Sequence, residues 1–331
     1  MPDNLENQTY YDVVLIGAGP TGIAAASEFK SAGLNYLHLE SGRLAQTIFN
    51  YPNNIRLFSH RRYLQTGNIC FPGKLDEAPT REEYLDYLNH VASQLELKIK
   101  LQSDAVELIP DNGNHCIRYQ NNGKKNEVFA SNVVIASGGY FSPRLLDIPG
   151  ESQKNVYHHF RTDMPISHKR VLVVGGRNSA IEASTTLVEK KAEVILSYRG
   201  SRLPRKKIKP WLLSPFDKAR QKGAIQLLYR TVLRSIQKKQ VTLLSDETKE
   251  LTMDIDKIFL LTGYGPDYSI LKNAAVPFHK RTNKPLFNQH TLETKIPGIF
   301  LCGTLVLAWQ GKKASIENTL GHGKIILKNL R

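Results

Sequence analysis

Cysteine is scarce in this sequence, and its scarcity excludes several kinds of protein. The three cysteines, Cys70, Cys116 and Cys302, lie far apart among 331 residues, with no C-x-x-C pair and no metal-ligand spacing. A disulfide-stabilised scaffold, a zinc module and a dithiol–disulfide active site are therefore disfavoured. Unpaired cysteines are typical of a reducing compartment, so we expect a cytoplasmic protein.

Long apolar runs are missing as well. The longest candidate, residues 299–309, is interrupted by a Cys-Gly-Thr turn signal and is shorter than the roughly 18 residues that a membrane helix needs. The first residues, MPDNLENQTYYD, have neither the basic start nor the apolar core of a signal peptide. We therefore expect no membrane partner.

Acidic residues are too few to balance the basic ones. The chain has 45 Lys and Arg against 30 Asp and Glu, a net charge of +15, and residues 162–284 alone hold 24 basic and 11 acidic residues. Such a segment could meet nucleic acid, a membrane surface, an anionic small molecule or an acidic protein, or be a solvated face. Nucleic acid is disfavoured, because no helix-turn-helix, zinc finger or aromatic platform accompanies the basic run 202–209.

A strand–turn–helix pattern near the N-terminus predicts a dinucleotide-binding site. An apolar strand runs into the segment GAGPTG (17–22), which a small-residue helix and a second strand follow. Gly17 permits the tight turn, Gly19 lets the backbone approach a pyrophosphate, and Gly22 lets the helix and strand pack closely. The helix N-terminus offers free N–H groups, and Glu40 after the second strand can accept from ribose hydroxyls. This site is shaped for FAD or NAD.

The same pattern recurs in the middle of the chain with two differences. Its turn and helix start are formed by Gly175, Gly176, Arg177, Asn178 and Ser179. Arg177 takes the place of the second glycine, and the second strand is followed by Arg199 instead of an acid. An acid there would repel a 2′-phosphate, whereas an arginine would pair with it. The second site is therefore shaped for NADPH, with Arg205, Lys206 and Lys207 as further candidate phosphate ligands.

Other segments indicate how the two patterns are connected. Strands that end in glycine, at 133–139 and 258–265, mark places where the chain leaves one nucleotide fold for the next. A late strand at 298–304 and a helix at 314–327 would return the chain to the first module. We predict an α/β protein with two Rossmann-like domains. The FAD domain is discontinuous, 1–161 plus 285–331, and the NADPH domain, 162–284, is inserted between its parts.

These motifs resemble the low-molecular-weight thioredoxin-reductase-like flavoproteins, and among them the bacillithiol-disulfide reductase family. The resemblance rests on IGAGP (16–20), FNYP (49–52), VGGRNSA (174–180), YRG (198–200), IKPW (208–211), GYGPDY (263–268) and IEN (316–318). It implies a homodimer or a larger homo-oligomer, with FAD held by Gly17, Gly19, Pro20, Thr21, Gly22, Glu40, Ser41, Gln46, Asn50, Val106, Gly138 and Gly303. It implies that NADPH is held by Gly175, Gly176, Arg177, Asn178, Ser179, Arg199 and Gly263.

One position departs from the family. Its members carry a cysteine directly after the Gly-Pro of the first turn, and this sequence has Thr21 there. A threonine hydroxyl has no accessible thiolate state, so it cannot attack a disulfide sulfur. Cys302 lies in an apolar strand and is expected in the core. Without a thiol relay, the reduced flavin must deliver electrons directly to the acceptor.

The leading hypothesis is an NADPH-dependent flavoprotein oxidoreductase. Its acceptor is a low-molecular-weight disulfide, such as bacillithiol disulfide, or an acidic redox protein. A ferredoxin- or flavodoxin-NADP reductase is an alternative, because those enzymes also lack the C-x-x-C pair. A flavin-containing monooxygenase is a second alternative, although Ser152 and Lys154 replace the Phe and Gly that should precede His158 in its F-x-G-x-x-x-H motif. A third is a non-enzymatic sensor that binds flavin and NADPH.

Overall fold

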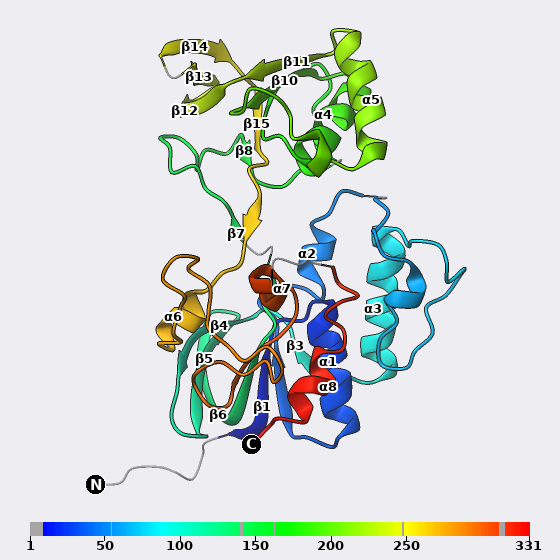
Figure 1. The fold of residues 1–331 in the computed structure, drawn as a ribbon, viewed down its shortest axis with the longest axis vertical. Helices are drawn as coiled ribbons and strands as arrows, with labels where there is room; N and C mark the ends of the chain where they lie inside the picture. The colour runs from blue at the N-terminus through cyan, green and yellow to red at the C-terminus, as the bar shows by residue number, and fades with distance from the viewer. Residues whose placement is uncertain (1–8, 54, 140–141, 162, 247, 311–314) are drawn as a thin grey trace. The chain divides into compact units, whose positions relative to one another are not determined.

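The chain divides into two compact units, which are described separately below. The computed structural model describes residues 9–53, 55–139, 142–161, 163–246, 248–310 and 315–331. The first unit comprises residues 1–49, 54–142 and 265–331, and the second comprises 50–53 and 143–264 (Figure 1). Two short paired strands, β7 (Ser142–Pro143) and β16 (Tyr264–Gly265), carry the chain from one unit to the other.

These boundaries lie earlier in the chain than residues 162 and 284, where the sequence places them. Leu146 and Ile148 pack against a core cluster of the second unit, so the segment after Pro143 already belongs to it. Ile270 and Leu271 are buried in the core of the first unit, so the chain has returned there before residue 284. The packing of these apolar side chains sets the boundaries between the two units. No sequence motif marks these residues.

The first unit is built on a seven-stranded sheet whose strand order is β3-β2-β1-β6-β5-β4, with β17 also paired to β6. The strands are β1 (Tyr10–Ile16), β2 (Tyr36–Leu39), β3 (Ile99–Lys100), β4 (Ser103–Ile109), β5 (His115–Asn121), β6 (Lys124–Ile135) and β17 (Ile299–Leu301). The helices are α1 (Pro20–Ser31), α2 (Gln46–Phe49), η1 (Arg61–Tyr63), α3 (Arg81–Gln94), α6 (Ser269–Asn273), α7 (Thr304–Gln310) and α8 (His322–Leu327).

The parallel strands of this sheet are apolar because both of their faces are covered. Val13, Val14 and Leu15 of β1 are fully buried between β2 and β6, with which β1 runs parallel. On α1, the small residues 24–26 are buried and bring the helix close to the sheet. The apolar strand and small-residue helix expected from the sequence are therefore confirmed.

The second unit has its own parallel sheet and a separate antiparallel one. The parallel sheet, in the order β11-β10-β9-β15-β8, contains β8 (Val156–Tyr157), β9 (Arg170–Val174), β10 (Glu193–Tyr198), β11 (Ile225–Tyr229) and β15 (Lys257–Leu260). The antiparallel sheet contains β12 (Thr231–Gln237), β13 (Gln240–Ser245) and β14 (Lys249–Asp254). The helices are α4 (Asn178–Glu189), α5 (Pro210–Gln221) and the short η2 (Arg205–Lys207).

The helix expected at 314–327 is wrong in its extent. The segment 316–321 forms bends and turns, and α8 begins only at His322, while Ala314 lies outside the described residues. The Thr319 hydroxyl donates to the carbonyl of Ile316 at 2.7 Å, which favours a turn over a continuing helix. In the part of the chain that the structure describes, no helix is long and apolar enough to cross a membrane.

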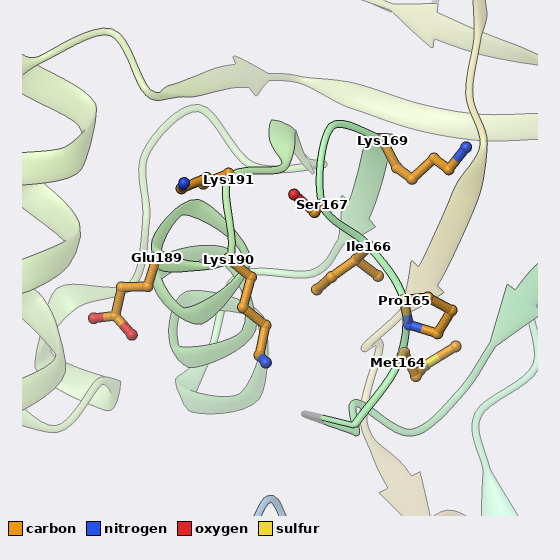
Figure 2. Close-up of a pocket in the computed structure, with 8 residues that line it drawn as sticks. All are labelled: Met164, Pro165, Ile166, Ser167, Lys169, Glu189, Lys190 and Lys191. Carbon is orange, nitrogen blue, oxygen red and sulfur yellow. The ribbon is translucent and has the colours of Figure 1, made fainter.

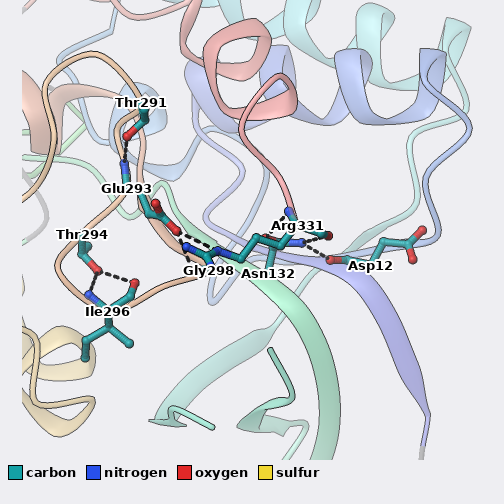
Figure 3. A network of polar contacts seen from close by, with 8 residues as sticks. All are labelled: Asp12, Asn132, Thr291, Glu293, Thr294, Ile296, Gly298 and Arg331. Atoms are coloured by element: carbon teal, nitrogen blue, oxygen red, sulfur yellow. Dashed lines mark hydrogen bonds and ion pairs between the residues drawn. The ribbon is translucent and has the colours of Figure 1, made fainter. Parts of the chain in front are cut away.

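A buried asparagine ties the last residue to the sheet of the first unit (Figure 3). Asn132 of β6 donates to the carbonyl oxygens of Asp12 and Arg331, at 3.1 and 3.2 Å, and accepts from the Arg331 N–H at 3.2 Å. The Arg331 side chain lies 3.3 Å from Glu293, which also accepts from the N–H of Gly298. The end of the chain is thereby fixed beside β1 and β6.

Candidate functional site

The first glycine turn lies at the carboxyl end of β1, where α/β sheets bind their ligands. Gly17 has a φ of +105°, and a β-carbon there would lie 2.6 Å from the carbonyl oxygen of Ala136. Its N–H donates to the carbonyl of Leu39 at 2.7 Å, which joins the turn to the end of β2. Gly19 faces open space, since nothing lies within 4 Å of the place that a β-carbon would take.

The start of α1 is free to receive an anion. Gly19 is the N-cap and offers no side chain to cap the helix, and Pro20 occupies the first turn. The first N–H groups of a helix have no partner within the helix, so those of Thr21 and Gly22 are donors at its positive end. Gly22 packs so closely that a β-carbon would lie 1.9 Å from the carbonyl oxygen of Gly17.

Glu40 closes the turn from the end of β2. Its carboxylate is buried and accepts from the backbone N–H groups of Ala18, at 2.7 Å, and Gly42, at 2.8 Å. Its carbonyl accepts from the N–H of Ser103, which brings the start of β4 to the same place. A carboxylate held this way keeps lone pairs for the hydroxyls of a ribose.

A buried histidine lies beneath the turn. His38 of β2 is fully buried, and its Nε2 lies 3.0 Å from the carbonyl oxygen of Gly17, to which the Nε2–H tautomer donates. Burial lowers the pKa of His38 to about 4, so the ring is neutral at physiological pH. His38 thus holds the carbonyl of the first glycine without adding charge to the site.

Thr21 is held between Gly303 and the segment that precedes α8. Its Oγ1 lies 2.6 Å from the Oγ1 of Thr319, and a β-carbon at Gly303 would lie 3.3 Å from it. The N–H of Gly303 donates to Nδ1 of His322 at 3.1 Å, and burial lowers the pKa of His322 to about 4. The structure therefore brings two of the predicted residues, Thr21 and Gly303, into contact.

Gly138 is joined to the same region through a neighbour. The N–H of Gly139 donates to the Oγ1 of Thr304 at 2.8 Å, and a β-carbon at Gly138 would lie 3.8 Å from that oxygen. The adjacent Ser137 Oγ is buried and has no hydrogen-bond partner in the described residues. Open glycines, a free helix start and an orphaned hydroxyl fit a bound dinucleotide.

The remaining residues expected to contact FAD are more dispersed. Ser41 and Gln46 are half-buried, and the Gln46 side chain accepts from the N–H of Arg43 at 3.3 Å. Val106 is 41% exposed at an irregularity in the pairing of β4 with β5. Asn50 belongs to the four residues that are grouped with the second unit, so the first unit alone does not bring it to the turn.

The second glycine turn repeats the geometry of the first. The N–H of Gly175 donates to the carbonyl of Ser197 at 3.0 Å, and a β-carbon at Gly175 would lie 2.5 Å from the carbonyl oxygen of Leu261. Arg177 is the N-cap of α4 and offers no side-chain cap, so the amides of the first turn remain available. Ser179 lies exposed in that turn.

The cations around this turn differ in their availability. Arg177 and Arg199 are exposed, and neither forms an ion pair with an acid of the described chain. Arg205, by contrast, binds both carboxylate oxygens of Asp217, at 3.0 and 2.6 Å, so the expectation that it helps to bind phosphate is not supported. The exposed Lys206 and Lys207 lie beside it.

Two other predicted residues have structural partners. The side-chain oxygen of Asn178 accepts from the N–H of Lys209 at 2.9 Å, which fixes the basic loop 205–209 to the start of α4. Gly263 has a φ of +105°, and its carbonyl accepts from the N–H of Arg144 at 2.9 Å. Asn178 therefore positions the loop as well as the helix start.

Comparison with known proteins agrees with this geometry. Residues 14–303 match the family model described as pyridine nucleotide-disulphide oxidoreductase. The chain belongs to this family. It is 31% identical over 310 residues to the bacilliredoxin reductase Bdr of Bacillus subtilis, covering 94% of each chain. It is 25% identical over 332 residues to ferredoxin–NADP reductase 2 of Bacillus cytotoxicus, covering 98% of this chain and 94% of that protein.

A solved structure extends the similarity to the whole fold. The bacillithiol disulfide reductase Bdr of Bacillus cereus superposes with a TM-score of 0.89 and 29% identity, covering 97% of this chain and 99% of that one. The expected thioredoxin-reductase-like architecture with two dinucleotide-binding domains is confirmed. This member of the pyridine nucleotide-disulphide oxidoreductase family is a flavoprotein oxidoreductase, and its cofactors are FAD and NADPH.

A hollow in the second unit lies away from the predicted nucleotide residues. It has a volume of about 490 Å³ and is lined by Met164, Pro165, Ile166, Ser167, Lys169, Glu189, Lys190 and Lys191 (Figure 2). These residues precede β9 or end α4, at the end of the unit opposite Gly175. Since ligands of such sheets bind at the carboxyl ends of the strands, this hollow is not the dinucleotide site.

The cysteines offer no thiolate next to the first turn. Cys302 is fully buried, as expected, and burial raises its pKa to about 12. Cys116 is buried on β5, and burial together with Glu127 raises its pKa to about 11. Cys70 is exposed and unpaired. Within the described residues, no group of three or more metal-ligating side chains is close enough to hold an ion.

The histidine pair singled out in the sequence lies next to Tyr264. The Tyr264 hydroxyl donates to the carbonyl of His158 and lies 3.1 Å from Nδ1 of His159, whose ring stacks on the tyrosine at 5.0 Å. Burial raises the pKa of Tyr264 to about 12 and lowers that of His159. These contacts hold β16 against the segment that follows β8, which is a structural role.

Sequence reasoning missed several residues of the two turns. His38 and Thr319 touch the first turn from other elements, and His322 binds the N–H of Gly303 beside it. The ring of Tyr198 touches the second turn. A histidine inside an otherwise apolar strand, two residues before the acid, was a signal for His38. Thr319 and His322 gave none, because they fall within the helix that the sequence predicts.

Proposed function

We propose that this protein transfers electrons from NADPH through FAD to a low-molecular-weight disulfide, such as bacillithiol disulfide. The overall reaction consumes NADPH, a proton and the disulfide, and yields NADP⁺ and two thiols. The observation that carries the path from NADPH to FAD is the asymmetry of the two turns. Glu40 closes the first turn, whereas the exposed Arg177 and Arg199 flank the second.

In the first unit, the turn and the start of α1 would bind FAD. Gly17 and Gly19 would admit the pyrophosphate, and the free amides of Thr21 and Gly22 would donate to it. Glu40 would accept from the adenosine ribose. Pro20, Ser41, Gln46, Val106, Gly138 and Gly303 of the same unit would complete the contacts. When bound, FAD supplies a ring that accepts a hydride from NADPH and passes two electrons on.

In the second unit, the amides at the start of α4 would bind the pyrophosphate of NADPH. Gly175 and Gly176 would form the turn under it, Asn178 and Ser179 would lie at the helix start, and Gly263 would border the nicotinamide end. Arg177 and Arg199 would pair with the 2′-phosphate, for which their planar charged groups are suited.

The names of the relatives support a disulfide as the acceptor. The matched relatives of B. subtilis and B. cereus are named for bacilliredoxin and bacillithiol disulfide. Thr21, however, cannot form a mixed disulfide with the substrate. The chain's own contribution is therefore to bind the disulfide and orient it, not to attack it.

An anaerobic titration tests this function. The FAD-loaded protein is titrated with NADPH while the visible flavin band is followed, and bacillithiol disulfide is then added. We expect the band to bleach and then to recover. Bleaching without recovery would contradict the disulfide acceptor, and an absence of bleaching would contradict the enzyme and favour a sensor.

A second candidate acceptor is an acidic ferredoxin or flavodoxin. The charge distribution favours it, because residues 143–264 hold 23 basic and 12 acidic residues, a net +11 of the total +15. A positive surface steers an acidic partner, and such association weakens with salt. We expect the rate with flavodoxin to fall steeply between low and physiological salt. A rate that is independent of salt would contradict this version.

We also propose a cytoplasmic homodimer. The three unpaired cysteines are compatible with a reducing compartment, and the resemblance to thioredoxin-reductase-like flavoproteins implies self-association. Light scattering on the FAD-loaded protein measures the mass, and a value near 37.3 kDa for one chain would contradict the homodimer.

A further inference from the structure

The two glycine turns make the same bond to the end of the neighbouring strand. The N–H of Gly17 donates to the carbonyl of Leu39 at 2.7 Å, and the N–H of Gly175 donates to that of Ser197 at 3.0 Å. Because the turns are anchored alike, the residue that follows each bonded carbonyl occupies the same place in its unit.

That residue is Glu40 in the first unit and Tyr198 in the second. The Glu40 carboxylate accepts from the N–H of Ala18, the residue after the first glycine. The corresponding residue of the second turn, Gly176, meets an aromatic ring instead. A β-carbon at Gly176 would lie 2.3 Å from both Cδ2 and Cε2 of Tyr198.

The ring also touches the glycine on its other side. A β-carbon at Gly200 would lie 2.7 Å from Cε1 of Tyr198 and 3.2 Å from its hydroxyl oxygen. Two positions without side chains therefore make room for this ring. Tyr198 is half-buried and packs against the apolar core of the unit, so its ring is held in place beside the turn.

Neither sequence neighbour of Tyr198 replaces the missing carboxylate. Ser197 is fully buried, and its hydroxyl lies 2.8 Å from that of Thr231, directed into the unit. Arg199 is exposed and carries only donors. At this strand end, an adenosine ribose would thus meet Tyr198 in the place where the first unit has the carboxylate of Glu40.

We propose that Tyr198 is a specificity-determining residue that makes the second unit select a 2′-phosphorylated dinucleotide. Its ring removes the acceptor that would hold the free 2′-hydroxyl of NADH. The 2′-phosphate of NADPH is held by Arg177 and Arg199, so only that nucleotide is anchored. This inference rests on the NADPH site proposed above. It adds a residue that disfavours the binding of NADH.

Calorimetric binding of NADP⁺ and NAD⁺ to the FAD-loaded protein tests the proposal. Three variants separate ring, hydroxyl and charge: Tyr198→Phe keeps the ring, Tyr198→Gln replaces it by a neutral acceptor, and Tyr198→Glu adds a carboxylate. We expect Tyr198→Phe to keep the wild-type ratio of the two dissociation constants. The preference for NADP⁺ should fall about 10-fold in Tyr198→Gln and about 100-fold in Tyr198→Glu, steps of about 1.4 kcal/mol each.

Two results would overturn the proposal. If Tyr198→Glu kept the wild-type ratio of the two dissociation constants, the residue at the strand end would not discriminate at the 2′ position. If Tyr198→Phe lost the preference for NADP⁺, the selection would belong to the tyrosine hydroxyl. Thermal unfolding of each variant identifies one that fails to fold, and Tyr198→Phe, the smallest change, keeps the test decisive. If wild type binds neither nucleotide, the proposed function fails; if it binds them without preference, only the selection fails.

The contact itself is tested by a double-mutant cycle. Gly176→Ala should weaken NADP⁺ binding, because its β-carbon meets the Tyr198 ring. In the Tyr198→Ser background the same substitution should have little effect, since the ring is gone. Equal effects in both backgrounds would show that Gly176 serves the nucleotide alone, and would contradict the ring-on-glycine arrangement.

Discussion

The hydroxyl of Thr21 donates its hydrogen to the hydroxyl of Thr319. Thr319 has a single hydroxyl hydrogen and gives it to the carbonyl of Ile316 at 2.7 Å, so Thr21 must be the donor in the 2.6 Å contact. Both side chains are buried. The position at which the bacillithiol-disulfide reductase family, which the motifs resemble, carries a cysteine is thus occupied here by a hydrogen-bond donor with a fixed direction.

Removing the acceptor should destabilise the first unit. In Thr319→Val the Thr21 hydroxyl remains buried without a partner, which costs about 1–3 kcal/mol of unfolding free energy. The double variant Thr21→Val/Thr319→Val should recover part of this loss, because no orphaned donor remains. Urea unfolding of wild type, Thr21→Val, Thr319→Val and the double variant measures the coupling, and strictly additive losses would contradict the bond.

Activity should not depend on any thiol. The pKa values of Cys116 and Cys302 are raised to about 11 and 12, so neither thiol ionises near pH 7, and only the exposed Cys70 is open to alkylation. We expect iodoacetamide to modify the NADPH-reduced protein at Cys70 alone, by mass spectrometry, with turnover unchanged. Cys70→Ser is the matched control. A loss of turnover on alkylation that Cys70→Ser prevents would assign a redox role to this cysteine.

The neutral His38 should make stability depend on pH. In the unfolded chain its pKa is 6.5, and in the folded chain about 4, so below pH 6.5 the unfolded state binds more protons. The unfolding free energy should therefore fall as the pH falls from 6.5 to 4, by about 3 kcal/mol for this group. His38→Gln keeps a donor for Gly17 and does not titrate. Denaturant unfolding between pH 4 and 8 should give it the shallower slope, and identical slopes would contradict the lowered pKa.

Arg199 should distinguish the two nicotinamide nucleotides. In Arg199→Glu the pairing with the 2′-phosphate is replaced by repulsion, so the KM for NADPH should rise at least about 10-fold while that for NADH changes little. Steady-state kinetics with both nucleotides measure the two values. Arg205→Glu is a control, because Arg205 is already paired with Asp217. Equal increases in the KM for both nucleotides would contradict the assignment of Arg199 to the 2′-phosphate.

Substitution of the buried Asn132 should lower the free energy of unfolding more than substitution of Arg331, which it binds. Asn132→Ala removes hydrogen bonds to the backbone of Asp12 and Arg331 and leaves buried polar groups unpaired, which costs about 2–4 kcal/mol. Arg331→Ala loses only a partly exposed ion pair with Glu293, worth about 0–1 kcal/mol. Thermal unfolding of the two variants should show this order, and the reverse order would contradict it.

Local patterns in the sequence were sufficient to predict the nucleotide folds. The strands at 13–16 and 36–39, the glycine turn between them and the second turn at 175–176 all follow from signals within a few residues, and all are present. The helix at 314–327 was wrong, because its middle is held in turns by Thr319, which lies 298 residues from its partner Thr21.

The residues that sequence reasoning missed depend on contacts between distant segments. His38 is a titratable residue in an apolar strand, and only the fold shows that its ring binds the carbonyl of Gly17. In the sequence, Tyr198 is notable only as a residue that is not acidic. Its contact with Gly176 becomes visible only when the register of β9 and β10 is known.

The discontinuity of the first unit has a consequence for its synthesis. β17 pairs with β6 at residues 133–135, and Gly323 of α8 packs on α1 so closely that a β-carbon would lie 2.6 Å from the Cα of Ala25. Both elements are translated after the whole of the second unit. The NADPH-binding fold can form during translation. The first glycine turn, by contrast, lacks β17 of its sheet and the covering helix α8 until those elements have been synthesised. FAD can therefore bind a complete first glycine turn only after β17 and α8 have been synthesised.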